Sequence, residues 1–141
     1  QLQERGIELV LLPTPVKPSV HPEKLTARLQ EIDHVLRNRS FDTFVSEMRQ
    51  AGVRILDPGP LLKERALNTG TPQYLATDTH WRPEAMQAVA AWVANELSDE
   101  MGKGDSQALR PETTDVTQIG DIGAMLELPE GQEILERSQQ R

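Results

Sequence analysis

The chain has 141 residues, of which 37% are hydrophobic and 26% are charged, a balance typical of a folded domain rather than of a disordered segment. Its net charge of −7, without a dense cluster of lysine and arginine, disfavours binding to nucleic acid and to anionic membrane surfaces. The absence of cysteine excludes disulfides, thiolate metal sites and a cysteine nucleophile. Because the chain begins with Gln1 and enters a strand pattern at once, we interpret residues 1–141 as one domain that is a piece of a longer protein.

A continuous apolar run, residues 7–12, begins the pattern of predicted elements. The run lies between Gly6 and Pro13, and a short apolar run between such breakers predicts a strand that is buried on both faces, as in a parallel sheet. The prolines that follow, up to Pro18, predict an extended segment.

Two amphipathic segments come next. Residues 21–38 carry leucine and isoleucine at spacings of three and four, and Pro22 lies where the first turn of a helix tolerates proline. Residues 40–52 have Ser40 as a candidate N-cap and Gly52 at their end. Both segments therefore predict helices with one buried face.

Strands and helices then alternate again. Residues 53–56 predict a second short strand that ends in a turn at 57–60, and residues 61–67 predict a brief helix. Residues 74–77 predict a third short strand. A long helix is predicted over residues 83–97, with a buried stripe made of Met86, Val89, Ala90, Val93 and Leu97. This alternation predicts an α/β fold with a short, mainly parallel sheet flanked by helices.

The last part of the chain is more polar. Residues 98–112 contain glycine and few apolar side chains, which predicts an exposed loop. Residues 119–128 have enough apolar residues for a short packed segment. Residues 130–141 are strongly polar and predict a solvated tail.

An acid and a histidine lie two residues apart in "DTHW", between the third predicted strand and the long helix. On an extended chain, side chains two apart project to the same side, so Asp78 and His80 would share a face with Cα atoms roughly 6.5 Å apart. An aspartate there can bond one imidazole nitrogen and leave the other as a base, which is the base half of a nucleophile–base–acid triad. Ligands of open α/β sheets bind at such strand ends.

Other interpretations stay open from the residues alone. Asp78 or Thr79 can cap the helix that begins near Pro83, with His80 as a polar loop residue, and this interpretation stays ahead of catalysis on spacing alone. Aspartate and histidine are also metal ligands, but His21 and His34 lack ligand-like spacing to His80. A metal site is therefore the weakest of the three interpretations.

Four blocks in order carry a family resemblance. They are "GIELVLLPTPVKPSVHPEKL" from Gly6, "VRILDPGPLLKERA" from Val53, "YLATDTHW" from Tyr74 and "GDIGAMLELP" from Gly120. Together they cover most of residues 6–129, and they resemble the SGNH-hydrolase-like domain of the alginate O-acetyltransferase AlgX/AlgJ family. The resemblance implies a partial SGNH-like, flavodoxin-like α/β fold.

The resemblance also implies a function. In such a domain Asp78 and His80 would be the acid and base of a Ser-His-Asp triad that transfers or removes acetyl groups on an exopolysaccharide in the bacterial periplasm. The partners implied are the exopolysaccharide, an acetyl donor and other subunits of an acetylation complex, without a cofactor or a metal. The alternative is a non-catalytic exopolysaccharide-binding or assembly subunit that keeps the fold.

The nucleophilic serine is the part of the pattern that does not match. In the family it follows the "GDIGAMLELP" block, in a Gly-Asp-Ser turn after a strand. Gly104–Ser106 reads Gly-Asp-Ser, but it precedes that block and lacks an apolar strand before it, so we interpret Ser106 as a surface-loop residue. We expect the nucleophile beyond Arg141, and we expect the 141-residue chain alone to be inactive because triad members act as a unit.

Overall fold

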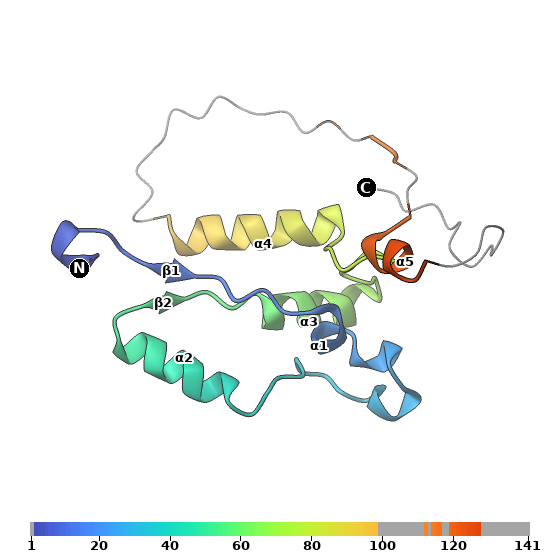
Figure 1. The fold of residues 1–141 in the computed structure, drawn as a ribbon, viewed down its shortest axis with the longest axis horizontal. Coiled ribbons are helices and arrows are strands. Elements are labelled where there is room, and N and C mark those ends of the chain that lie inside the picture. Colours follow the sequence, from blue (N-terminus) through green and yellow to red (C-terminus); the bar gives the residue numbers. More distant parts are fainter. Residues whose placement is uncertain (1, 99–111, 113, 117–118, 128–141) are drawn as a thin grey trace. The chain divides into compact units, whose positions relative to one another are not determined.

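The computed structural model describes residues 2–98, 112, 114–116 and 119–127 (Figure 1). The chain divides into two compact units, Gln1–Thr71 and Pro72–Arg141, and each is considered by itself. Among the described residues, the helices are too short or too polar to cross a lipid bilayer. The interpretation of residues 1–141 as one truncated domain stays a prediction.

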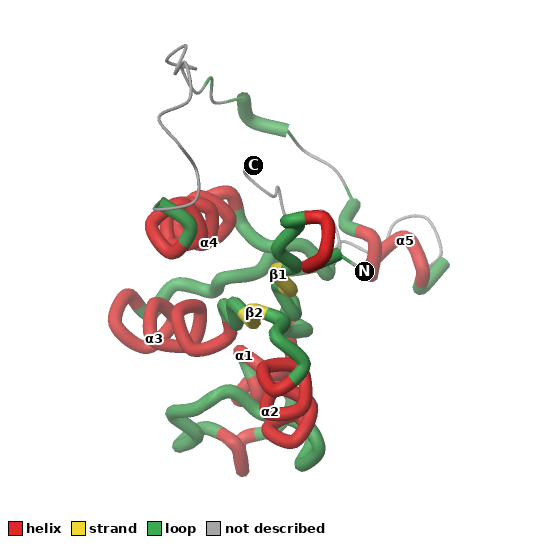
Figure 2. The backbone as a smooth tube through the Cα atoms, turned by 90° about the vertical axis from the view of Figure 1, so that its left-hand side faces the viewer, coloured by secondary structure: helices red, strands yellow, loops and turns green. Residues whose placement is uncertain are grey.

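The described part of the first unit contains a two-stranded parallel sheet. After a short 3-10 turn, η1 (Gln3–Arg5), strand β1 (Val10–Leu11) pairs with β2 (Arg54–Ile55), and both views show the two strands side by side (Figures 1 and 2). A parallel pair needs a long connection, which here contains helices. The predicted α/β fold with a short parallel sheet is confirmed.

The first strand is shorter and more open than predicted. Only Val10–Leu11 of the apolar run 7–12 forms a strand, and Ile7, Leu9 and Leu12 are exposed. The prediction of burial on both faces was wrong, because it assumed a wide sheet with both faces covered, whereas each strand here has a single described neighbour.

The helix predicted over residues 21–38 is absent from the described structure. Short helical turns take its place: α1 (Lys17–Val20), η2 (Pro22–Lys24) and η3 (Ala27–Leu29). Pro18, predicted to be extended, lies in the first turn of α1. Thr26 is extended, and its hydroxyl oxygen accepts the N–H of Arg28 at 3.4 Å, so a side chain competes with the helical bond. Leu25 is consequently 63% exposed rather than part of a buried stripe.

Helix α2 (Phe41–Gln50) confirms the second predicted helix. Ser40 occupies the N-cap position, but its N–H and its hydroxyl both donate to Oδ1 of Asn38, each at 3.0 Å. Gly52 follows the helix with a φ of 77°, a left-handed conformation that glycine adopts without strain. The chain can therefore turn directly into β2.

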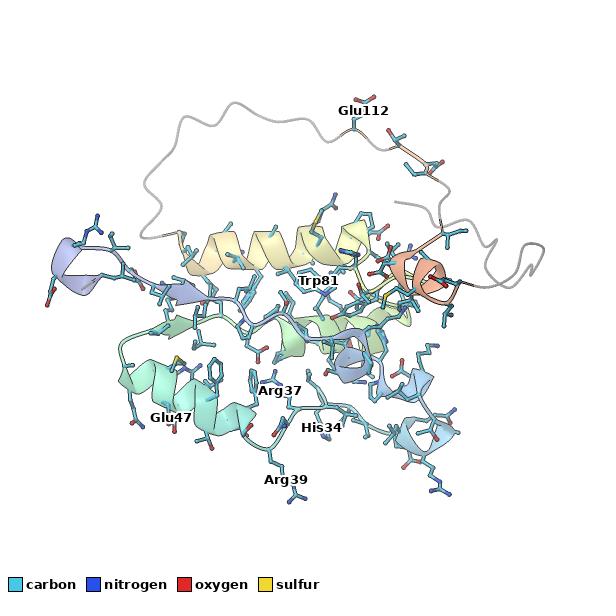
Figure 3. All side chains as sticks on the ribbon, in the orientation of Figure 1. His34, Arg37, Arg39, Glu47, Trp81 and Glu112 are labelled. Carbon is cyan, nitrogen blue, oxygen red and sulfur yellow. The ribbon has the colours of Figure 1, made fainter. Side chains whose placement is uncertain are left out.

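Helix α3 (Gly59–Thr69) is longer than the predicted helix at 61–67, because it includes part of the predicted turn. Oδ1 of Asp57 accepts the N–H of Gly59 at 3.0 Å, which stabilises the helix start. The carboxylate of Asp57 also pairs with Arg37, whose guanidinium lies 4.3 Å from the ring centroid of Phe41. Arg39, by contrast, points away from the unit (Figure 3).

The second unit begins with a tight reversal of the chain instead of a third parallel strand. Tyr74 and Trp81 form an antiparallel bridge, the N–H of Leu75 donates to the carbonyl of His80 at 3.1 Å, and the N–H of Arg82 donates to that of Gln73 at 2.9 Å. The third-strand prediction was wrong because residues 76–80 turn back on themselves.

Helix α4 (Pro83–Glu96) confirms the long helix predicted over residues 83–97. Its buried side chains are Ala85 and Val89, whereas Met86 is 57% exposed and Ala90 is exposed as well. The predicted stripe was therefore partly wrong: it favoured the larger apolar side chain, but the small Ala85 occupies the closely packed face.

Helix α5 (Asp121–Met125) lies inside the packed segment predicted at 119–128. It packs through its small residues, because Gly120 and Gly123 are buried while Met125 is exposed. Of the predicted loop at 98–112, Ser98 and Glu112 are described and exposed. Glu112 is labelled in Figure 3. The rest of that loop and the predicted tail at 130–141 lie outside the described residues.

Candidate active site

The turn between Tyr74 and Trp81 brings Asp78 and His80 together. Oδ1 of Asp78 accepts the backbone N–H of His80 at 2.9 Å and contacts Nδ1 of the His80 ring at 2.5 Å. The first bond is that of an Asx-turn, in which an aspartate bonds the backbone two residues on. The predicted contact is therefore present, but the predicted shared strand face is wrong: the two residues meet through a turn.

The two side chains differ sharply in burial. The side chain of Asp78 is 2% exposed and that of His80 is 73% exposed. An ionised carboxylate can only accept a hydrogen bond, so Nδ1 of a neutral His80 ring carries the proton. The other nitrogen, Nε2, is then left unprotonated on a ring that faces solvent. This is the tautomer that a general base requires.

Asp78 is held in its ionised form. Burial raises the pKa of its carboxyl, but the hydrogen bonds from the backbone and ring of His80, together with the charge of His80, outweigh burial and lower the pKa to about 2. At neutral pH the histidine therefore lies beside a full negative charge. That charge stabilises the imidazolium that forms when Nε2 takes up a proton.

The structure adds a residue that the sequence analysis missed. Oδ1 of Asp121, the first residue of α5, accepts the N–H of Thr79 at 2.7 Å, and the Thr79 hydroxyl donates to Oδ2. Oδ2 also lies 3.7 Å from Nδ1 of His80. The available signal was the acid between glycines in "GDIG", but nothing local in the sequence brings residue 121 next to residue 79.

Glycine allows α5 to approach this turn. A Cβ atom on Gly120 would overlap the carbonyl of Thr77 and would lie 2.8 Å from Cβ of Asp78. The N–H of Gly123 donates to the same Thr77 carbonyl at 3.3 Å. The start of α5 is thus in backbone contact with the turn that carries the acid and the base.

The capping interpretation does not hold for this turn. The N-cap position of α4 belongs to Arg82, not to Asp78 or Thr79. The carboxylate of Asp78 bonds His80, and the hydroxyl of Thr79 bonds Asp121. These polar groups therefore bond within the turn and to Asp121 of α5, and neither caps α4.

Three residues lie close enough to be considered as metal ligands. Asp78, His80 and Asp121 offer atoms within 4.8 Å of one another. However, Nδ1 of His80 and Oδ1 of Asp78 are 2.5 Å apart, whereas two ligand atoms on one tetrahedral zinc lie about 3.3 Å apart. The arrangement is therefore that of a hydrogen bond rather than of a shared ion.

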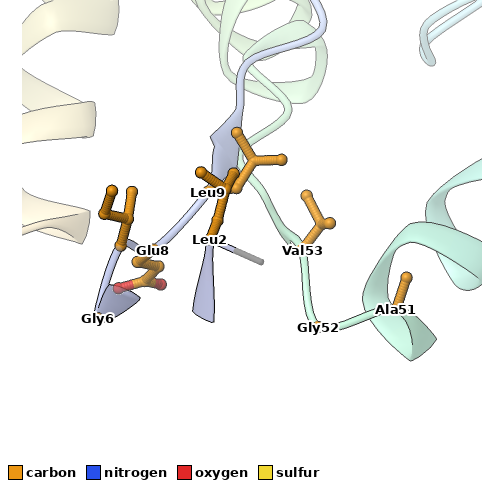
Figure 4. A pocket seen from close by; sticks show the side chains of 8 residues that line it. Leu2, Gly6, Glu8, Leu9, Ala51, Gly52 and Val53 are labelled. Atoms are coloured by element: carbon orange, nitrogen blue, oxygen red, sulfur yellow. The ribbon is translucent and has the colours of Figure 1, made fainter. Parts of the chain in front are cut away.

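A hollow in the first unit has a different character. It has a volume of about 690 Å³ and is shown in Figure 4, and its lining is Leu2, Gly6, Ile7, Glu8, Leu9, Ala51, Gly52 and Val53. Among these residues only Glu8 carries a charge, so the lining offers no nucleophile or base–acid pair. The predicted loop residue Ser106 lies outside the described residues.

Comparison with protein families and curated proteins gives consistent matches. A family model described as the SGNH hydrolase-like domain of acetyltransferase AlgX matches residues 1–141. The alginate biosynthesis protein AlgX of Pseudomonas aeruginosa is 31% identical over 103 residues, which are 72% of this chain and 21% of that protein. The probable alginate O-acetylase AlgJ of the same organism is 29% identical over 99 residues, or 70% of this chain and 24% of that protein.

Comparison with solved structures agrees. The O-acetyltransferase domain of Pseudomonas putida AlgJ superimposes with a TM-score of 0.71 at 28% sequence identity, and the match covers 99% of this chain and 48% of that one. The chain thus spans about half the length of this solved domain and a quarter or less of the curated relatives it matches.

Proposed function

We propose, because this chain belongs to the family of the SGNH hydrolase-like domain of acetyltransferase AlgX, that it supplies the acid and the base of a serine-dependent acetyl-transfer site. Asp78 is the acid and His80 is the base. The observation that carries the proposal is the 2.5 Å contact between the buried, ionised Asp78 and Nδ1 of the exposed His80.

In the proposed reaction, Nε2 of His80 takes the proton of a serine hydroxyl while the serine oxygen attacks the carbonyl carbon of an acetyl donor. Asp78 stabilises the imidazolium, and Nε2 then gives its proton to the leaving group. The acetyl-serine is attacked by a sugar hydroxyl, whose proton passes through the same nitrogen and back to the serine. The serine itself is proposed to lie outside this chain, in a longer protein that contains it.

The proposed acceptor is an exopolysaccharide hydroxyl. Two relatives support this class, since one is named an alginate biosynthesis protein and the other a probable alginate O-acetylase. From the family resemblance alone we propose action in the periplasm, with an acetyl donor and further subunits of an acetylation complex as partners. The net charge of −7 disfavours binding of an anionic polymer to this chain alone, so a neutral glycan, or a basic cleft completed by residues outside this chain, is also proposed.

The test is made in the longer protein that contains this chain. His80→Ala and Asp78→Ala should each lower the rate of acetyl transfer, or of hydrolysis of an activated acetyl ester, about a thousandfold or more. His34→Ala is the matched control, because His34 is also an exposed histidine whose Nδ1 contacts an aspartate, Asp33, at 3.2 Å. That control should keep the full rate.

Two outcomes would contradict the proposal. If His80→Ala keeps its fold and its full rate, the chain would instead be a non-catalytic, polysaccharide-binding member of the family. If the 141-residue chain alone hydrolyses the ester in an Asp78-dependent manner, the nucleophile lies within this chain and its proposed location outside it is wrong.

A further inference from the structure

We infer that Asp121 is a positioning residue that holds His80 against Asp78. It does so through two hydrogen bonds to Thr79, the residue between them, which together are called the grip. The inference rests on the proposed roles of Asp78 and His80 as acid and base. It assigns a role to the first residue of α5, and that role can be tested by spectroscopy as well as by activity.

The grip has two points. Oδ1 of Asp121 accepts the backbone N–H of Thr79 at 2.7 Å, and Oδ2 accepts the hydroxyl of the same residue. One bond fixes the peptide plane that precedes Cα of Thr79, and the other fixes the side chain. Because Asp78 and His80 flank Thr79 directly, fixing Thr79 sets the distance and angle at which the acid and the base meet.

His80 needs this support because packing does not supply it. Its side chain is 73% exposed, so its orientation depends on hydrogen bonds rather than on a surrounding core. Asp78 is anchored by burial on one side of the turn. Asp121 adds two hydrogen bonds at Thr79 to the backbone bonds that close the turn.

Backbone contacts attach the start of α5 to the turn that contains Thr79. Gly120 lies so close to Thr77 and Asp78 that a side chain on it would overlap the Thr77 carbonyl, and that carbonyl accepts the N–H of Gly123 at 3.3 Å. Asp121 lies between these two contacts. Its backbone is therefore placed from both sides, which limits how far its carboxylate can drift from Thr79.

Charge adds a second contribution. Oδ2 of Asp121 is 3.7 Å from Nδ1 of His80, so two carboxylates face the same edge of the ring. Both favour the imidazolium that forms while His80 acts as a base. Asp121→Asn removes the charge and replaces one of the two acceptor oxygens with an NH2 group, so it should weaken both contributions.

The first experiment measures the tautomer of His80 in the 141-residue chain labelled with ¹⁵N-histidine. At pH 8 the wild-type ring should carry its proton on Nδ1, and Asp121→Ala should shift it toward the mixture found in an unstructured histidine peptide. The Thr79 amide should exchange with solvent about tenfold faster in Asp121→Ala, as expected for the loss of a hydrogen bond. Asp115→Ala, at an exposed aspartate earlier in the same segment, should change neither.

The second experiment uses activity in the longer protein. Asp121→Ala should lower kcat about tenfold to a hundredfold with KM unchanged, because a slightly misplaced base affects the reaction rather than binding. Thr79→Ser, which keeps the hydroxyl, should retain the wild-type rate, and Thr79→Val, which keeps only the backbone bond, should fall between. This series carries the test if Asp121→Ala does not fold.

The outcomes separate this inference from the proposed function. An unchanged His80 tautomer and Thr79 exchange rate in Asp121→Ala would overturn the positioning role, whatever Asp78→Ala does to activity. If the His80 tautomer changes in Asp121→Ala while Asp78→Ala and His80→Ala both keep full activity, the positioning role of Asp121 is supported and the proposed catalysis is rejected. His80 resonances that shift when EDTA is added would assign Asp121 to a cation site and overturn its role as a positioning residue.

Discussion

Asp78 is a buried acid that stays ionised because hydrogen bonds, two of them from His80, favour its charged form. The backbone N–H and the ring of His80 both point at one oxygen, so a single turn supplies both donors. A buried charge is costly unless it is paired and bonded, and here the pairing is built into five consecutive residues, 76–80. The turn therefore stabilises a buried charge and also carries the candidate site.

Replacing Asp78 by Asn should change how stability depends on pH. The pKa of Asp78 is about 2 in the folded chain, against an ordinary value of 3.8. Above 3.8 its full contribution is present; as the pH falls toward 2, the unfolded chain takes up the proton first and stability is lost, by at most about 2 kcal/mol. Asp78→Asn should remove this part of the acid-induced loss.

Urea unfolding followed by tryptophan fluorescence between pH 2 and pH 7 measures the effect, since Trp81 and Trp92 both lie in the second unit with Asp78. Asp33→Asn is the control: the bond from His34 also lowers the pKa of Asp33, but both side chains are exposed and solvent screens the pair. Equal acid-induced losses in wild type and Asp78→Asn would contradict the assignment.

Helix α5 shows how a short element can position a site through its backbone. Its apolar side chains are largely exposed, so its attachment to the turn comes from Gly120, Asp121 and Gly123. The predicted packed segment was right in place but rested on apolar side chains such as Met125, which is 80% exposed. Close approach of two backbones, rather than burial of large side chains, accounts for the contact.

Gly120→Ala should detach α5 from the turn. The φ of Gly120 is −67°, which any residue adopts, so alanine fails there only because its Cβ would overlap the Thr77 carbonyl. Overpacking of this kind costs about 1–3 kcal/mol. We expect faster exchange of the Thr79 amide and a lower unfolding free energy of the second unit, measured by hydrogen exchange and by fluorescence.

Gly70→Ala is the matched control for that substitution. Gly70 caps α3 with a φ of 65° and open space around the missing Cβ, so alanine strains the backbone there without a clash. It should weaken the end of α3 and leave the Thr79 amide unchanged. A Thr79 exchange rate that stays at the wild-type value in Gly120→Ala would show that α5 does not depend on this close approach.

For the molecule as a whole, the response to mild acid depends on a buried histidine, His21. His21 lies in the first unit, with Nδ1 3.0 Å from Oε1 of Glu23, whose other oxygen is 3.8 Å from the buried Nζ of Lys63. Burial lowers the pKa of His21, against the opposing effect of Glu23, and the nearby Lys63 and Lys24 lower it further. Among the described residues, each unit thus contains a buried group that makes stability depend on pH in the acidic range.

His21→Gln should flatten the pH dependence of stability below pH 6.5. The unfolded chain protonates this residue near its ordinary pKa of 6.5, whereas the folded chain does so only at lower pH, so wild-type stability falls as the pH drops through 6.5. Thermal unfolding followed by circular dichroism between pH 5 and pH 8 measures this. His34→Gln, at an exposed histidine, should behave like wild type, and a wild-type slope in His21→Gln would contradict the prediction.

Local patterns accounted for much of the architecture. The paired strands near residues 10 and 54, and helices α2 and α4, follow from apolar runs, periodicity and breakers that act over a few residues. The failure over residues 21–38 has a local cause too: the hydroxyl of Thr26 bonds the backbone and interrupts a periodic pattern. The buried face of α4 was predicted wrongly because close packing depends on the shape of a side chain as well as on its apolar size.

The contact between Asp78 and His80 could be predicted because the two residues are only two positions apart. In many turns an aspartate side chain accepts the backbone N–H of the residue two positions later. The contact between Thr79 and Asp121 spans 42 residues, and its formation depends on a glycine that lets α5 approach the turn. Such a contact requires the folded chain, because closing a long loop is favourable only when many interactions form together. The acid–base pair is thus local chemistry, whereas its support belongs to the tertiary fold.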